Sequence, residues 1–147
     1  MEWVAFLRGV NVGGHGTLPM KPFCAALMVE GFGHVRSYIQ SGNILITSDK
    51  DPAAICAQVQ QVMQRGFDLE QPVLLRSRDE LDTTLAQVPR QARDTPKALM
   101  IYLHDSAAEL DAILPLLTPT EALMDGPKCT YLRAPDGIGR SKAAAKI

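Results

Sequence analysis

The order of strand-like and helix-like segments in residues 3–76 constrains the fold most strongly. Residues 3–8 are predicted to form a strand, and its residues 3–7 are apolar at both odd and even positions, which favours a central strand with two covered faces. A helix, two strands, a second helix and a strand at residues 72–76 follow. The order strand–helix–strand–strand–helix–strand is typical of the ferredoxin-like unit and predicts an α+β fold.

The periodicity of apolar residues predicts two helices in this unit. The first ends at Gly31, and the second begins at Asp49–Pro52 and closes at Gly66. Gly42-Asn43 is predicted to be a two-residue hairpin turn between the second and third strands. The side chains expected on the inner faces of the two helices are Met20, Phe23, Cys24, Leu27, Met28, Ile55, Val59, Val62 and Met63.

The remaining chain repeats part of this order. A helix with Leu81, Leu85 and Val88 inward leads into a polar connector, and a strand begins at residue 98. A helix carrying Leu110, Ile113, Leu114 and Leu117, two strands around a turn at Gly126-Pro127, and a helix capped by Ser141 follow. We therefore expect a first half at 1–77, a helix and connector at 78–97, and an incomplete second copy at 98–147.

The final helix is expected to be short. Only six residues follow Ser141, and isolated helices of that length are marginal without tertiary partners. We expect a C-terminal piece that would complete the second half to be absent from this sequence.

The glycine-rich stretch Arg8–Lys21 is the first candidate for a functional loop. It holds four glycines between a strand and a helix N-terminus, where backbone amides and the helix dipole can bind an anion. Gly9 and Gly14 have P-loop spacing, but His15 and Gly16 replace the required Lys and Ser/Thr. The alternative is that the glycines serve only the geometry of the chain.

Several motifs resemble the domain-of-unknown-function family 1697. They are Phe6–Gly14, Leu18–Met20, Ser37–Asn43 and Ile138–Lys142, which together span most of the chain. The resemblance implies an α+β fold of two ferredoxin-like halves and no established activity. Members of that family continue past the equivalent of Ile147 through another helix and a Thr-Ala-Arg-Asn-Trp-like motif, which this sequence lacks.

Polar and glycine residues at loop edges form the candidate ligand-binding set. The hairpin that contains Gln40 and Ser41 is expected to form one wall of the site. The cations beside Ser141 oppose the dipole of the last helix, and an anion would relieve this conflict; the alternative is an ordinary solvated basic end. The candidates are Arg8, Asn11, Gly13, Gly14, Lys21, Gln40, Ser41 and Asn43, joined by Arg140 and Lys142 if the two halves face each other.

Familiar catalytic and metal-binding patterns are absent from the sequence. There is no Gly-x-Ser-x-Gly motif, and Ser41 has no identifiable histidine and carboxylate partners. The histidines lack metal-ligand spacing, and the three cysteines are far apart, as expected of reduced thiols. We expect no metal, cofactor or disulfide, and the sequence leaves open whether the protein is an enzyme.

Composition narrows the classes of partner. The net charge is −1, no apolar run is long enough to span a membrane, and no basic segment precedes an apolar core at the N-terminus. We therefore expect a cytoplasmic protein without a membrane partner that binds a phosphate-bearing small ligand. RNA or single-stranded DNA is an alternative partner, disfavoured by 5% aromatic content and near-zero charge. A structural or oligomerisation role, such as a homodimer, is a third.

Overall fold

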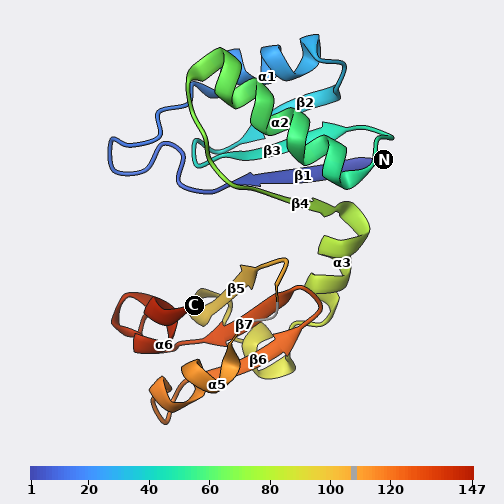
Figure 1. Cartoon of the computed structure of the whole chain (residues 1–147). Coiled ribbons are helices and arrows are strands. Elements are labelled where there is room, and N and C mark those ends of the chain that lie inside the picture. The colour runs from blue at the N-terminus through green and yellow to red at the C-terminus, as the bar shows by residue number, and fades with distance from the viewer. Residues whose placement is uncertain (107–108) are drawn as a thin grey trace. The chain divides into compact units, whose positions relative to one another are not determined.

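The computed structural model describes residues 1–106 and 109–147. These form two compact units, Met1–Leu81 and Asp82–Ile147 (Figure 1). Each unit combines helices with an antiparallel sheet, of four strands in the first and three in the second. The α+β class predicted from the sequence is thus confirmed. Within the described residues, none of the helices is both long and apolar enough to cross a membrane.

The sheet of the first unit is built around β1 (Glu2–Leu7). Its other strands are β2 (Gly33–Tyr38), β3 (Asn43–Thr47) and β4 (Val73–Ser77), in the order β2-β3-β1-β4. β1 pairs with β3 on one side and with β4 on the other, so it is a central strand, as its two apolar faces predict.

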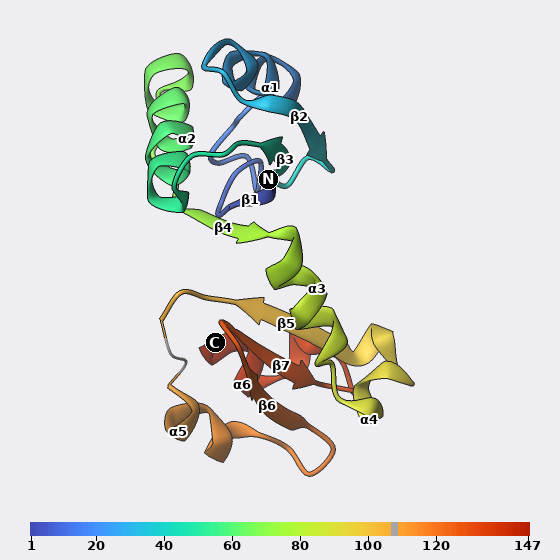
Figure 2. The same ribbon diagram turned by 90° about the vertical axis from the view of Figure 1, so that its right-hand side faces the viewer.

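Two helices cover one face of this sheet, α1 (Met20–Val29) and α2 (Pro52–Phe67) (Figures 1 and 2). Phe23 of α1 meets Phe67 of α2 edge to face, with ring centroids 5.6 Å apart. The core between helices and sheet contains Trp3, Ala5, Leu7, Phe23, Leu27, Ile44, Ile46, Ile55, Val59, Val62, Met63 and Leu75.

The ends of the two helices differ in chemistry. Gly31 takes a φ of +92°, and Phe32 N–H donates to the Leu27 carbonyl at 3.2 Å, which closes α1 as the sequence predicts. The prediction that Gly66 closes α2 was wrong, because the helix continues to Phe67. Asp68 adopts the left-handed conformation instead (φ 51°), which aspartate tolerates better than most residues.

Two further details of the first unit correct the sequence analysis. The connection between β2 and β3 has four residues, Ile39–Gly42, rather than a two-residue turn at Gly42-Asn43, since Asn43 already pairs with Tyr38. Gly42 is held by the end of β1, because Leu7 N–H donates to the Gly42 carbonyl at 2.8 Å. Met28 is exposed, because the buried face of α1 is narrower than its apolar pattern.

The helix α3 (Arg78–Ala86) leads from the first unit into the second. Ser77 and Glu80 cap its start reciprocally, with Ser77 N–H donating to the Glu80 carboxylate at 2.8 Å and Glu80 N–H to Ser77 Oγ at 3.2 Å. Leu85, predicted to face inward, is exposed; Thr84 is buried instead, and its carbonyl accepts from Tyr131 Oη at 2.6 Å. Short helices follow at α4 (Arg90–Arg93) and η1 (Pro96–Ala98).

The sheet of the second unit has the order β5-β7-β6. Its strands are β5 (Leu99–Leu103), β6 (Ala122–Gly126) and β7 (Cys129–Arg133). The turn between β6 and β7 is Pro127-Lys128, one residue later than predicted, with Lys128 at φ 55°. In both sheets the first strand pairs with the third and the third with the second.

The helices of the second unit are short. α5 (Leu110–Ile113) continues as η2 (Leu114–Leu116), and of its predicted inner residues Ile113 is buried while Leu114 is exposed. η3 (Ile138–Arg140) precedes α6 (Lys142–Lys146). Ser141 caps α6 as predicted, accepting from Ala144 N–H at 3.1 Å.

Candidate functional site

The glycine-rich loop after β1 is a miniature hairpin. Val12 and His15 exchange backbone hydrogen bonds of 3.3 and 3.0 Å around Gly13 and Gly14, whose φ angles are 59° and 75°. At Gly16 (φ 62°) a Cβ would collide with the carbonyl oxygen of Gly9. The glycines thus serve the geometry of the chain, and they also leave the tip of the hairpin bare.

Asn11 holds this hairpin against the β2–β3 loop. Its side-chain Nδ2 donates to the carbonyls of Leu18 and Gln40, both at 2.8 Å, and its Oδ1 accepts from Leu18 N–H at 2.8 Å. Its own N–H donates to the Gly16 carbonyl at 2.9 Å, and its φ is 51°. These bonds use the Asn11 amide, so we interpret Asn11 as a residue that positions the loops.

Three segments meet where β1 ends, and we call this region the loop end. The Arg8–Thr17 loop and the Ile39–Gly42 loop touch through Asn11, and a Cβ on Gly42 would strike Val10. The third segment is Gln71-Pro72, where the Pro72 carbonyl accepts from Arg8 N–H at 3.1 Å. The sequence alone did not show whether the two loops share one end of the sheet.

Most candidate side chains of the first unit are exposed at or beside the loop end. Asn43, half-buried at the start of β3, pairs with Tyr38. Within the part of the chain that the structure describes, the side chains of Arg8 and Lys21 make no hydrogen bond to another residue. The exposed candidates are Arg8, Gly13, Gly14, Lys21, Gln40 and Ser41.

The N-terminus of α1 supplies fewer free amide donors than a regular helix start would. Pro19 is the N-cap residue and makes no side-chain cap, and Pro22 in the first turn has no N–H. Leu18 N–H is already bound by Asn11. The amides of Met20 and Lys21 therefore remain as the first-turn donors, and an anion here would depend on side-chain charge as well.

The segments around the loop end carry basic residues but almost no acidic ones. Residues 3–29 and 31–48 contain no aspartate or glutamate, although the protein as a whole carries a net charge of −1. The three segments of the loop end contain no carboxylate, and Glu70, which directly precedes Gln71, accepts a hydrogen bond from Gln64. The formal charge of the three segments is accordingly positive. This signal was present in the sequence but was hidden by the near-zero total charge.

The remaining two candidates belong to the second unit. Arg140 ends η3 and Lys142 begins α6, and both are exposed. Between them Ser141 is buried and donates through Oγ to the Glu121 carboxylate at 3.2 Å. Their contribution to a site shared with the first unit stays a prediction.

Burial also affects the pKa of side chains outside the candidate set, including the Cys24 thiol and the Tyr131 phenol. Burial raises the pKa of the Cys24 thiol, an effect that a hydrogen bond with Ser37 reduces. Burial also raises the pKa of Tyr131, and its neighbour Cys129 raises it further. All three cysteines are free thiols, and among the described residues no group of three or more His, Cys, Asp or Glu side chains is placed to hold a metal ion.

Comparison with known proteins shows a family. Residues 1–131 match the model described as Protein of unknown function (DUF1697), and the chain belongs to this family. No curated protein matches the sequence. The fold is similar to that of the conserved bacterial protein SP0830 from Streptococcus pneumoniae, with a TM-score of 0.80 and 20% identity over 97% of this chain and 83% of that one. At this identity the likeness concerns the fold alone.

Proposed function

We propose that this member of the DUF1697 family binds a phosphate-bearing ligand at the loop end of its first unit. The observation that carries the proposal is the joining of two loops by Asn11 beside exposed Arg8 and Lys21, in segments almost free of carboxylates. Such a surface lowers the free energy of a bound anion without an opposing charge nearby.

Each part of the loop end has a role in this proposal. The Arg8 guanidinium can donate two parallel hydrogen bonds to a phosphate, and the Lys21 ammonium adds a second positive charge. The bare tip at Gly13 and Gly14 lets a ligand approach the backbone closely. Gln40 and Ser41 present exposed polar groups from the second loop. The arrangement binds and orients a ligand, and we assign no reaction to it.

A second candidate function is the binding of single-stranded nucleic acid. On the sheet face opposite the helices, Phe6 of β1 and Tyr38 of β2 both lie directly across from Asn43 of β3. Tyr38 is 67% exposed and borders the Ile39–Gly42 loop. An exposed aromatic ring beside a phosphate-binding loop is the pairing that single-stranded nucleic acids use.

The experiment that tests the proposal is a binding titration. Inorganic phosphate, a panel of nucleotides and a short labelled oligonucleotide are titrated against the protein and against Arg8→Ala. Because a charged hydrogen bond contributes about 1.5–3 kcal/mol, we expect Arg8→Ala to weaken binding roughly ten- to hundredfold. Arg90→Ala removes an exposed arginine from the start of α4 in the second unit and serves as the matched control.

The pattern of results separates the candidates. Binding of nucleotides that depends on Arg8 and not on Tyr38 supports a small ligand. Binding of the oligonucleotide that falls with Tyr38→Ala supports nucleic acid. If no anion binds, or if Arg8→Ala and Arg90→Ala behave alike, the loop end is a structural connection. Arg140→Ala and Lys142→Ala test whether the second unit contributes.

We also propose that the two units are related copies of one ferredoxin-like unit. The support is the shared pairing of first with third and third with second strand, and the helix that follows the first strand in each. Superposition of residues 1–77 on 98–147 in a crystal structure tests this. Helices on opposite faces of the two sheets would contradict it.

A further inference from the structure

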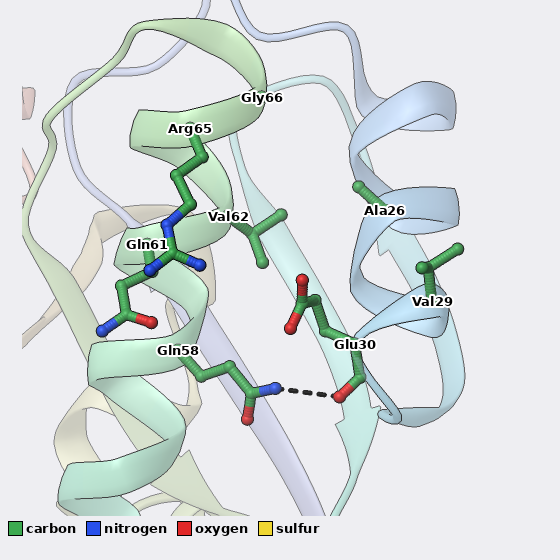
Figure 3. Close-up of a pocket in the computed structure, with 8 residues that line it drawn as sticks. All are labelled: Ala26, Val29, Glu30, Gln58, Gln61, Val62, Arg65 and Gly66. Atoms are coloured by element: carbon green, nitrogen blue, oxygen red, sulfur yellow. Dashed lines mark hydrogen bonds between the residues drawn. The ribbon is translucent and has the colours of Figure 1, made fainter.

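A groove runs along the outer side of the first unit between α1 and α2 (Figure 3). Its volume is about 370 Å³. Val29 of α1 and Glu30 directly after it lie at one end, and Arg65 and Gly66 of α2 at the other, with Val62 between them (Figure 3). Gln58 donates to the Glu30 carbonyl at 2.8 Å and joins the helices at the first end.

The exposed surface of the two helices carries few charges, although Glu30 directly after α1 and Arg65 of α2 line the groove itself. Among the exposed residues of α1 and α2, only Lys21 and Arg65 are charged, and the rest are Ala, Gln, Pro, Gly and single Met and Val residues. Charged residues make up 21% of the whole chain. Depletion of charge marks the core of protein interfaces, so the composition of the two helices is compatible with a face that another protein surface covers.

Gly66 leaves a gap in the apolar side of α2. Ile55, Val59, Val62 and residue 66 follow one another at i, i+4, i+7 and i+11, so a side chain at 66 would extend the buried row. A Cβ added to Gly66 would meet no atom within 4 Å. Since packing within the chain does not require glycine in this helix, the gap is open to a side chain from elsewhere.

Val29, in contrast to the gap at Gly66, protrudes from the surface. It is the last residue of α1, and its side chain is 86% exposed beside the groove. A β-branched side chain is rigid and loses little entropy when it is buried in a contact. Val29 is therefore suited to fill a gap of the kind that Gly66 leaves.

The charges at the two ends of the groove complement each other as well. Glu30 lies at the C-terminal end of α1, where the helix dipole opposes a negative charge. Within the described residues neither Glu30 nor Arg65 has an oppositely charged group within 4 Å. One end of the groove thus offers a protruding side chain and an acid, and the other offers a gap and a base.

We propose that this face binds a second copy of the chain through a two-fold axis across the groove. The axis exchanges the two ends, so that Val29 of each copy enters the gap at Gly66 of its partner and Glu30 meets Arg65. Such isologous contacts are self-complementary and close upon themselves. The helices α1 and α2 are about 15 and 24 Å long. A face of this size buries roughly 1,000 Å² in total over the two copies, which is the low end for a specific interface.

Sedimentation equilibrium tests the proposal. We expect a monomer–dimer equilibrium between about 10 µM and 1 mM, as suits an interface of this size. Val29→Lys should abolish the dimer, whereas Met28→Lys makes the same change at the adjacent, exposed residue outside the groove and should leave it intact. Circular dichroism checks that both variants are folded.

Charge exchange tests the pairing of the two ends. Glu30→Arg or Arg65→Glu alone places like charges together in both symmetric contacts and should weaken the dimer roughly tenfold. The double variant should restore it. A chain that stays monomeric at 1 mM, a dimer that survives Val29→Lys or falls apart with Met28→Lys, or a double variant that does not recover would each overturn the proposal.

Discussion

Removal of the half-buried Asn11 side chain should destabilise the first unit, because this side chain joins two loops. Asn11→Ala deletes three side-chain hydrogen bonds of 2.8 Å, to Leu18 N–H, the Leu18 carbonyl and the Gln40 carbonyl. Each contributes about 0.5–1.5 kcal/mol, and water can replace part of each because the site is only partly buried. We expect a net loss of about 1.5–3 kcal/mol.

Part of this loss has a conformational origin that a second variant isolates. Asn11 adopts a φ of 51°, which asparagine tolerates and alanine resists. Asn11→Gly deletes the same hydrogen bonds but accepts the backbone angle readily, so it should be less harmful than Asn11→Ala by up to about 1 kcal/mol.

Urea unfolding followed by tryptophan fluorescence is the assay. Trp3 is the single tryptophan of the chain and is buried in the core of the first unit, so its emission reports on that unit. The slope of the free energy of unfolding against urea should stay constant while the midpoint falls. A loss below about 0.5 kcal/mol for both variants would refute the argument that Asn11 holds the loops together.

Three further predictions concern single residues. Gly16→Ala should cost about 1–3 kcal/mol, because a Cβ meets the Gly9 carbonyl and the φ of 62° is strained; an unchanged urea midpoint would contradict this. Gly66→Ala should stabilise the monomer by about 0.5–1 kcal/mol in thermal melts at low concentration, since the site has room for a Cβ within the helix. Cys24 should react with a disulfide reagent only above the ordinary pH range of a thiol, because burial raises its pKa. Its contribution to stability is therefore complete below that range and is lost as the pH rises through the raised pKa.

The sequence by itself determined the local elements of this protein. The apolar periodicity of residues 55–63 and the two apolar faces of residues 3–7 depend on burial, which the pattern of side chains encodes directly. The Gly31 terminus of α1 and the Ser141 cap of α6 were predictable for a similar reason, because each is made by residues a few positions apart. The glycine-rich loop was found because positive φ angles favour glycine.

Tertiary structure decided where those elements meet. Nothing local to Gly42 indicates that it packs against Leu7 and Val10, so the four-residue connection between β2 and β3 could not be predicted from turn preferences. The bond from Asn11 to the Gln40 carbonyl spans 29 positions in the sequence, and it is what brings the two candidate loops together. The groove between α1 and α2 likewise depends on how two distant helices pack on one sheet. Contacts between remote segments are set by the packing of the whole core, and periodicity within one segment carries no information about them.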